Sequence, residues 1–294
     1  MTIADLGLRI ADRATTAQSA IHNPQSAIAW RLFLDSAGRP GAENMAIDEA
    51  LLRDAAATGA AWLRLYRWAP PCLSLGRNEP ALDLYDRAAI ERRGMDVVRR
   101  PTGGRAVWHE HEVTYAVAAP IAAFGSLRAA YRTTHERLAA ALQALGLDVE
   151  LAAERQPAHP PVRPTACFSS AAGGEILVRG RKLVGSAQVR LGAAFLQHGS
   201  ILLHGSQDAV RAVSRQLTAN SQHLTANSGE TTLSAALGRP VSFDEVATAI
   251  VGSWGDGPTP SVPVRPCPAP SVPVPVRLRP SPSVFSDPAW TWRR

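Results

Sequence analysis

The sequence predicts an α+β fold in which a mixed, mostly antiparallel sheet is packed with helices. Short runs of alternating apolar and polar residues follow one another closely, as strands joined by hairpins do. Two longer stretches, at 43–57 and 126–146, carry apolar residues at helical spacing. These helices stand between groups of strands without alternating regularly with them. The order therefore favours an α+β sheet over a regular βαβ arrangement.

In the first half of the chain, strands are expected where β-branched, aromatic and aliphatic residues cluster or alternate with polar ones. These strands are 30–34, 62–68, 72–75, 95–100 and 113–118. The helix at 43–57 follows Gly41, and a shorter helix is expected at 86–93, just before Gly94.

In the second half, the long helix at 126–146 ends at Gly146 and leads into a proline-rich loop at 157–164. Three more strands are expected, at 176–179, 182–189 and 195–203, followed by helices at 207–217 and 243–254. These elements together predict one domain over 29–257.

The two ends of the chain differ from this domain. Residues 1–28 are rich in Ala, Ser, Thr and Gln, and residues 258–294 are rich in proline, with Pro-Ser-Val-Pro-Val at 260–264 and again at 270–274. Proline fixes φ and removes a backbone donor, so no helix or central strand can persist there. Both ends are predicted to be disordered, and a short repeat at 217–228 indicates one expanded loop.

Composition excludes several classes of protein. The chain of 294 residues has a net charge of +6, but residues 258–294 account for +4 of it, so the domain itself is nearly neutral and no nucleic-acid partner is expected. No apolar run is long enough to cross a membrane, and no secretory signal is recognisable at the N-terminus. The three cysteines lack the spacing of a disulfide framework or a metal site, which predicts a cytoplasmic protein without a bound metal.

The first candidate site is the segment 99–109, RRPTGGRAVWH, in which a strand enters a glycine pair and returns toward His109. Glycines allow close backbone approach to a ligand, and arginines offer fixed donors to a carboxylate, phosphate or carbonyl. The spacing matches neither a dinucleotide fingerprint nor a Walker loop. A tight hairpin with solvated arginines would show the same pattern.

The second candidate is Lys182, within GRKLVGSAQ at 180–188. It is the only lysine in the chain, beside 30 arginines. A site that needs a compact ammonium or a removable proton cannot use arginine. The alternative is the chance survival of one lysine.

Cys167 and His198 complete the candidates. Cys167 lies in a loop among small and polar residues, where Lys182, His109 or His198 could lower its pKa, whereas Cys72 lies in an apolar strand and is expected to be a buried small hydrophobe. His198 precedes Gly199 in an otherwise apolar strand. A glycine there often marks the close approach of a ligand or of another backbone.

Taken together, the segments 99–109, 180–188 and 197–203 resemble the motifs of the biotin/lipoate protein ligase superfamily, and 44–50 resembles its first helix. The resemblance covers about residues 30–255 and implies a biotin/lipoate ligase-like catalytic domain. Within the superfamily, a cysteine upstream of the motif lysine, as at Cys167, is typical of the cysteine-dependent octanoyltransferase branch. Arg105, where many ligases have a third glycine, also suits that branch.

The resemblance implies Cys167 and Lys182 as catalytic residues, with octanoyl-acyl carrier protein as acyl donor and lipoyl domains or the glycine cleavage H protein as acceptor. No cofactor is expected, and the protein is expected to act as a monomer. The implied substrate-binding residues are Arg100, Thr102, Gly103, Gly104, Arg105, His109, Gly185, Ser186, Ala187, His198 and Gly199.

Two other functions are compatible with these motifs. An ATP-dependent lipoate–protein ligase or an octanoyl/lipoyl amidotransferase would share the same motifs, and the ligase would need ATP and magnesium. An inactive acyl-binding remnant is a third possibility, because the family's C-terminal helical region is replaced by the proline-rich segment after residue 257.

Overall fold

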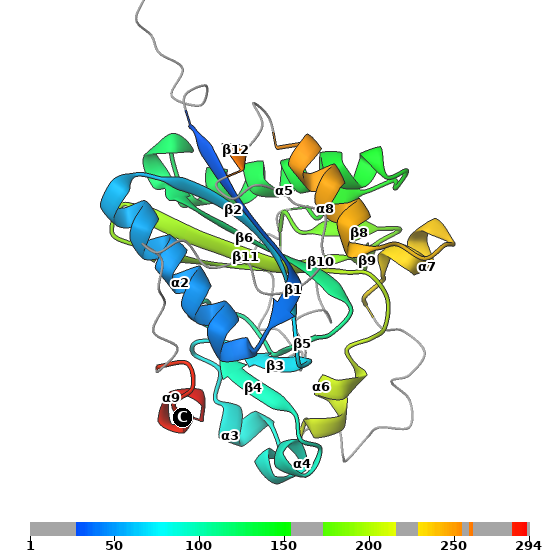
Figure 1. The fold of residues 1–294 in the computed structure, drawn as a ribbon. Coiled ribbons are helices and arrows are strands. Elements are labelled where there is room, and N and C mark those ends of the chain that lie inside the picture. Colours follow the sequence, from blue (N-terminus) through cyan, green and yellow to red (C-terminus); the bar gives the residue numbers. More distant parts are fainter. Residues whose placement is uncertain (1–27, 154–172, 216–228, 255–258, 261–283, 293–294) are drawn as a thin grey trace, which may run out of the picture.

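A six-stranded sheet forms the centre of the computed structural model, which describes residues 28–153, 173–215, 229–254, 259–260 and 284–292 (Figure 1). The strand order is β10-β11-β6-β2-β1-β12. β1 pairs in parallel with β2 and β12, and the other neighbours are antiparallel, which confirms the predicted mixed sheet. The strands are β1 (Trp30–Arg39), β2 (Ala61–Trp68), β6 (Glu112–Pro120), β10 (Val184–Leu191), β11 (Ala194–Leu202) and β12 (Thr259–Pro260).

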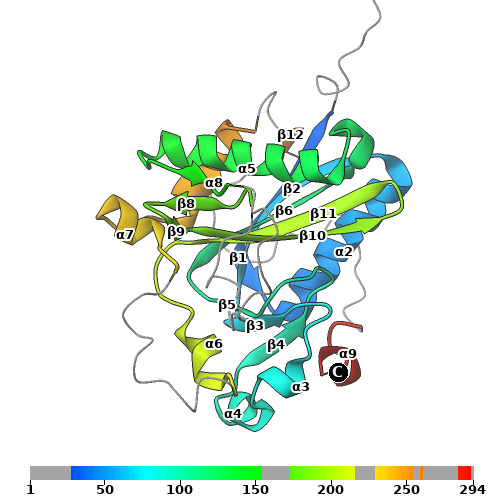
Figure 2. The ribbon, with the colours of Figure 1, turned by 180° about the vertical axis from the view of Figure 1, so that it is seen from behind.

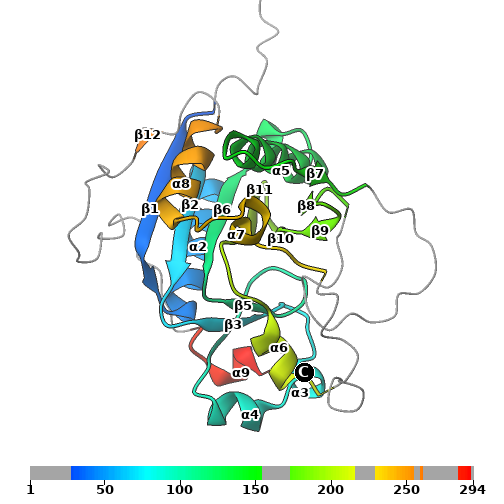
Figure 3. The ribbon, with the colours of Figure 1, turned by 90° about the vertical axis from the view of Figure 1, so that its right-hand side faces the viewer.

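Helices cover both faces of this sheet (Figure 3). Helix α2 (Gly41–Thr58) lies on one face, and α5 (Leu127–Ala144) and α8 (Phe243–Gly252) lie on the other. Side chains alternate between the faces along β2. Trp62, Tyr66 and Trp68 belong to the core cluster under α2, whereas Leu63 and Leu65 belong to the one under α5 and α8.

Two three-stranded sheets flank the central one (Figure 2). The first has the order β4-β3-β5, and three short helices pack around it. The second has the order β7-β8-β9 and includes Lys182. The remaining elements are β3 (Cys72–Leu75), α3 (Ala81–Leu84), α4 (Arg87–Arg92), β4 (Asp96–Arg99), β5 (Val107–His109), η2 (Ile121–Ala123), β7 (Glu150–Leu151), β8 (Ile176–Val178), β9 (Arg181–Lys182), α6 (Asp208–Val213) and α7 (Leu233–Leu237).

Most predicted elements are confirmed with small shifts at their ends, but the helix predicted at 207–217 is the shorter α6, which ends at Val213. The Ser126 hydroxyl accepts from the backbone N–H of Ala129 and so begins α5, and Gly59 in the left-handed conformation ends α2. The single strand predicted at 182–189 is instead divided between β9 and β10, because Lys182 pairs with β8 and Val184 begins the pairing with β11. α3 and α7 were not predicted, since four or five residues carry no helical periodicity.

Part of the tail predicted to be disordered is folded. Residues 284–292 pack against β4 and include helix α9 (Pro288–Thr291), the red element in Figure 1. Phe285 is only 3% exposed, and the indole N–H of Trp290 donates to the carbonyl oxygen of Arg99 at 2.9 Å. Aromatic residues give this stretch the apolar surface that the preceding prolines and serines lack, which explains the departure from the prediction.

Other expectations lie outside the described residues. These are the N-terminal extension at 1–28 apart from Ile28, the loop at 157–164, Cys167, the repeat at 217–228 and most of the proline-rich tail. Within the part of the chain that the structure describes, no helix is both long enough and apolar enough to cross a membrane.

We expect Phe285→Ala to lower the free energy of unfolding by about 3 kcal/mol or more, because it removes a buried aromatic ring from the core. Urea denaturation would measure the change. Val284→Ala is the matched control, since Val284 is 52% exposed and its truncation should cost little. Equal stabilities of the two variants would show that residues 284–292 do not contribute to the core.

Candidate active site

A small cavity lies where the central sheet meets the sheet formed by β3, β4 and β5. Its walls come from α2 and from strands of both sheets, so segments far apart in the sequence meet there. The lining residues are Met45, Tyr66, Trp68, Ser74, Arg100, Val107, His109, Thr114, Gly185, Ser186, Ala187, His198, Gly199 and Ser200.

Most of the predicted binding residues meet at this cavity. Seven of them line it: Arg100, His109, Gly185, Ser186, Ala187, His198 and Gly199. Thr102 lies behind the wall, hydrogen-bonded to His198. The remaining three, Gly103, Gly104 and Arg105, line a separate hollow with Asn78, Glu79, Pro80 and Leu84.

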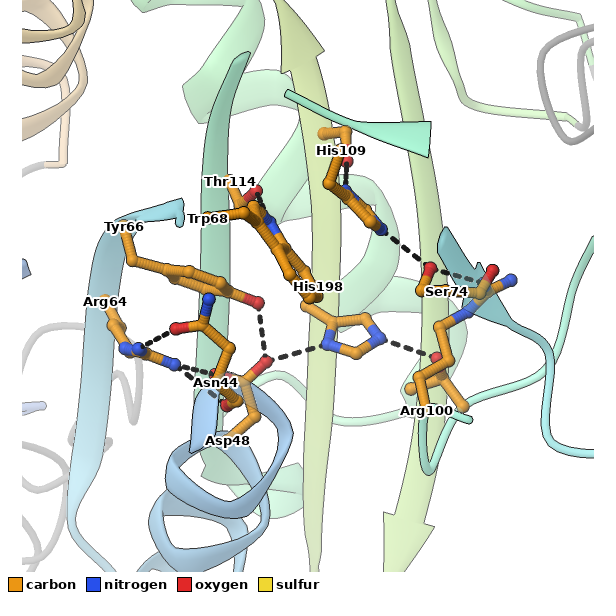
Figure 4. Close-up of polar contacts among 12 residues, drawn as sticks. Asn44, Asp48, Arg64, Tyr66, Trp68, Ser74, Arg100, His109, Thr114 and His198 are labelled. Atoms are coloured by element: carbon orange, nitrogen blue, oxygen red, sulfur yellow. Dashed lines mark hydrogen bonds and ion pairs between the residues drawn. The ribbon is translucent and has the colours of Figure 1, made fainter. Parts of the chain in front are cut away.

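A buried carboxylate, Asp48, connects helix α2 to the cavity wall (Figure 4). Its oxygens accept hydrogen bonds from Arg64 Nη1 at 2.8 Å, from the Tyr66 hydroxyl at 2.9 Å and from His198 Nδ1 at 2.8 Å. Burial by itself would raise the pKa of Asp48. The hydrogen bond with His198 and the charge of Arg64 outweigh burial and hold that pKa below its usual value, so Asp48 is ionised at neutral pH.

Arg64 is the cation of this network and is fully buried on β2. Besides Asp48, its guanidinium donates to the side-chain oxygen of Asn44 at 2.6 Å and lies 3.3 Å from Asp35. It also stacks 3.8 Å from the centre of the Tyr66 ring. Asn44 and Asp48 are one helical turn apart on α2, which lets both side chains reach the same arginine.

His198 connects this network to the loop at 102–105, which we call the glycine loop. Burial lowers the pKa of His198, so the ring is neutral at neutral pH. Since a carboxylate only accepts, Nδ1 carries the proton that is donated to Asp48, and Nε2 accepts from the Thr102 hydroxyl at 2.6 Å. Thr102 opens the loop at 102–105, so α2 and β11 together hold the start of this loop.

His109, another lining residue, has a similar pair of contacts (Figure 4). Its Nδ1 lies 2.7 Å from Glu112 Oε1, and its Nε2 lies 2.7 Å from the Ser74 hydroxyl. The ring stacks on Trp68 with 4.0 Å between ring centres. These contacts fix the orientation of the imidazole in the cavity wall.

Arg99 and Arg100 donate hydrogen bonds to the backbone in and around the glycine loop. Arg100 donates to the carbonyl oxygens of Gly103 at 2.8 Å, Arg105 at 2.7 Å and Ser74 at 3.1 Å. Arg99 is fully buried and donates to the carbonyl oxygen of Gly76 at 2.6 Å. The expectation that these two arginines present their donors to a ligand is therefore not met, because backbone carbonyls occupy those donors.

Lys182 lies in a buried ion pair. Its Nζ is 2.8 Å from Glu175 Oε2, and both side chains are only 3% exposed. The second oxygen of Glu175 lies 3.4 Å from the backbone N–H of Ser186, a cavity-lining residue. The same carboxylate thus connects Lys182 to the cavity wall, an environment unlike that of a chance surface lysine.

Gly199 is required by the close approach of β10 to β11. A Cβ atom at this position would lie 2.5 Å from the carbonyl oxygen of Gly185 and 2.6 Å from the Ser186 hydroxyl. The glycine therefore leaves room for the Ser186 side chain, in agreement with the close approach predicted for it.

Of the cysteines, the structure describes Cys72 alone, which is fully buried in the core as predicted. Burial raises the pKa of the Cys72 thiol well above its usual value, so this cysteine is not a nucleophile. Cys167 lies outside the described residues, and its role stays a prediction.

Sequence reasoning missed several polar residues of the site. Asp48 and Arg64 each stand at an inward position of an otherwise apolar pattern, and a buried charge in such a pattern indicates a partner elsewhere. Glu175 and Glu112 precede or begin strands, and nothing in their local sequence distinguishes them from surface carboxylates.

We expect Asp48→Asn to lower the free energy of unfolding by about 3 kcal/mol or more, because it leaves the buried Arg64 without its closest carboxylate. Glu49→Gln is the matched control on the same helix, since Glu49 pairs only with the exposed Arg53 among the described residues. Urea denaturation at neutral pH would compare the variants. If they prove equally stable, the Asp48 network does not hold the site together.

Comparisons with known proteins agree with this architecture. The chain is 39% identical over 236 residues to octanoyltransferase LipM of Symbiobacterium thermophilum, covering 76% of this chain and 85% of that protein. It is 43% identical over 178 residues to octanoyltransferase LipM of Carboxydothermus hydrogenoformans, covering 59% of this chain and 65% of the relative.

Solved structures share the fold. Lipoate-protein ligase A bound with ATP superposes with a TM-score of 0.62 at 24% identity, covering 78% of this chain and 85% of the other. The protein Ta0514 of Thermoplasma acidophilum superposes with a TM-score of 0.67 at 21% identity, covering 90% of this chain and 99% of the other. The family model of the lipoyl protein ligase A/B catalytic domain matches residues 40–254. The chain therefore belongs to the lipoyl protein ligase A/B catalytic domain family.

Proposed function

We propose that this protein transfers an octanoyl group from octanoyl-acyl carrier protein, through a thioester on Cys167, to a lysine of lipoyl-dependent proteins in the cytoplasm. The observation that carries the proposal is its similarity to proteins named octanoyltransferase LipM, at 39% identity over 85% of the Symbiobacterium relative. Lipoyl domains or the glycine cleavage H protein would be the acceptors, and no cofactor would be required.

The reaction has two steps. The Cys167 thiolate attacks the thioester carbonyl, a carbon–sulfur bond to the enzyme forms, and the carrier thiol leaves. Exchange of one thioester for another is nearly balanced in free energy, so ATP is not needed. The acceptor amine then attacks the acyl-enzyme, and formation of an amide from a thioester makes this step effectively one-way.

Lys182 would supply the positive charge that this chemistry needs. An ammonium carries three N–H donors, and one of them is directed at Glu175 in the buried ion pair. This geometry favours a donor role, in which Lys182 holds the acyl carbonyl and stabilises the oxyanion of the tetrahedral intermediate. The buried Glu175 carboxylate fixes the position of this ammonium.

The cavity supplies apolar surface for the acyl chain. Met45, Trp68 and Val107 contribute apolar atoms to its wall, and each methylene that leaves water contributes about 0.8 kcal/mol to binding. His109 and His198 would have a structural role in the cavity wall, since their ring nitrogens contact Ser74 and Thr102.

We expect incubation with octanoyl-acyl carrier protein to add one octanoyl group to the protein without ATP, and Cys167→Ala to abolish this adduct. Intact-mass analysis with and without ATP would measure it. Cys72→Ala, which removes the buried core cysteine, is the matched control and should keep the adduct. An adduct that persists in Cys167→Ala, or activity that needs ATP and free octanoate, would contradict the proposal and favour a ligase.

Lys182→Arg should lower the rate of octanoyl transfer by about 100-fold or more, because the larger planar guanidinium cannot occupy a site built for a compact ammonium. The reciprocal change at the exposed neighbour, Arg181→Lys, is the control and should leave the rate nearly unchanged. Single-turnover transfer to a lipoyl domain would measure both. A normal rate in Lys182→Arg would mean that the lysine is a chance survivor.

A further inference from the structure

The Ser186 hydroxyl is a polar group of the cavity wall that has no role in the two steps of acyl transfer proposed for Cys167 and Lys182. Ser186 lies on β10, four residues after Lys182, and is half-buried. Among the described residues, its hydroxyl oxygen contacts the Tyr115 hydroxyl at 2.6 Å and His135 Nε2 at 2.9 Å. These partners come from β6 and α5, so three elements fix the position of one oxygen.

The direction of the bond to His135 follows from the other ring nitrogen. His135 Nδ1 lies 2.9 Å from the carbonyl oxygen of Tyr131, which can only accept, so Nδ1 carries a proton. Burial, with a further contribution from the charge of Lys182, lowers the pKa of His135 to about 4. The ring is therefore neutral at neutral pH, its Nε2 is an acceptor, and the Ser186 proton points at it.

The direction of the bond to Tyr115 follows in the same way. Because the single Ser186 proton is already donated to His135, the Tyr115 hydroxyl is the donor in its contact with Ser186, and it also accepts from the Gln197 side-chain N–H at 3.1 Å. Burial raises the pKa of Tyr115, which keeps this phenol protonated. A hydroxyl has one proton and two lone pairs. Counting contacts within the described residues, Ser186 therefore has one lone pair left over and no proton left over.

An unused acceptor distinguishes between the reactants. The acyl chain has no polar group, and the thioester carbonyl and its oxyanion only accept, so neither can bind a Ser186 oxygen whose proton is already committed. The attacking amine carries N–H groups and can. We propose that Ser186 is a further catalytic residue that accepts a hydrogen bond from the attacking lysine amine, with His135 and Tyr115 as positioning residues. This inference rests on the proposed function, because it assigns the amine's place in its second step.

The bonds balance without another reactant. The amine nitrogen forms a bond to the acyl carbon, the carbon–sulfur bond breaks with its electron pair going to sulfur, and the amine's proton ends on that sulfur as a thiol. Ser186 orients the amine so that its lone pair faces the carbonyl, while Lys182 donates to the carbonyl oxygen. Ser186 thus binds the amine as an acceptor, and Lys182 binds the carbonyl oxygen as a donor.

The test separates the two half-reactions. We expect Ser186→Ala to form the octanoyl adduct within about twofold of the wild-type rate, and single-turnover transfer from the adduct to a lipoyl domain to slow about tenfold or more. Normal adduct formation shows in the same experiment that the variant is folded. Ser206→Ala, an exposed serine away from the cavity, is the matched control and should change neither rate.

Two variants of His135 test the positioning role separately. His135→Gln places an acceptor oxygen near the position of Nε2 and should restore transfer to within about threefold of wild type. His135→Leu has no acceptor, frees the Ser186 proton and should slow transfer as Ser186→Ala does. A merely structural role of the histidine would not make glutamine and leucine differ in the transfer step alone.

The outcomes distinguish the inference from the proposed function. Wild-type transfer rates in Ser186→Ala would overturn the inference and leave the function standing. If the wild type acylates the lipoyl domain only from octanoate and ATP, the proposed function fails, and the same variants test Ser186 in that assay by the same criterion. If neither donor supports transfer to the amine, both proposals are wrong.

Discussion

The structure depends most on a buried ion pair between a helix and the sheet that it covers. Arg64 on β2 and Asp48 on α2 are both fully buried, so each would be costly to bury without the other. The pair is supported by Asn44, Tyr66 and His198, which supply the hydrogen bonds that water would otherwise provide. A helix held only by apolar contacts could shift along the sheet, but one held by this network has a single register.

The three buried histidines near the cavity share one arrangement. Each has an oxygen acceptor beside Nδ1, from Asp48, Glu112 or the carbonyl of Tyr131. Each also has a hydroxyl beside Nε2, from Thr102, Ser74 or Ser186. In this way residues on the glycine loop, on β3 and on β10 are fixed to neighbouring elements by the same chemistry. Polar side chains, as well as packing, therefore connect the walls of the cavity.

Much of the fold could be predicted from the sequence, because the strands and long helices have regular apolar patterns and recognisable ends. The pairing of β1 with β2 in parallel could not, since local patterns do not define strand partners. At the site, the glycine and lysine motifs predicted which segments meet. The partners that give those motifs their geometry could not be predicted: Glu175 beside Lys182 and His135 beside Ser186 depend on contacts between distant segments. Arg99 and Arg100 were interpreted as ligand donors because sequence alone does not show that backbone carbonyls occupy them.

The contact between Arg99 and the segment carrying α9 has a consequence for synthesis of the protein. Arg99 Nε donates to the carbonyl oxygen of Thr291, 192 residues further along the chain. At typical ribosomal speeds, about 10 to 40 s pass between the appearance of these two residues. During that interval the Arg99 guanidinium, which lies at the base of the glycine loop, lacks one of the carbonyl oxygens that accept its hydrogen bonds in the folded protein. Arg99 can therefore complete its contacts beneath the loop only after Thr291 has been synthesised.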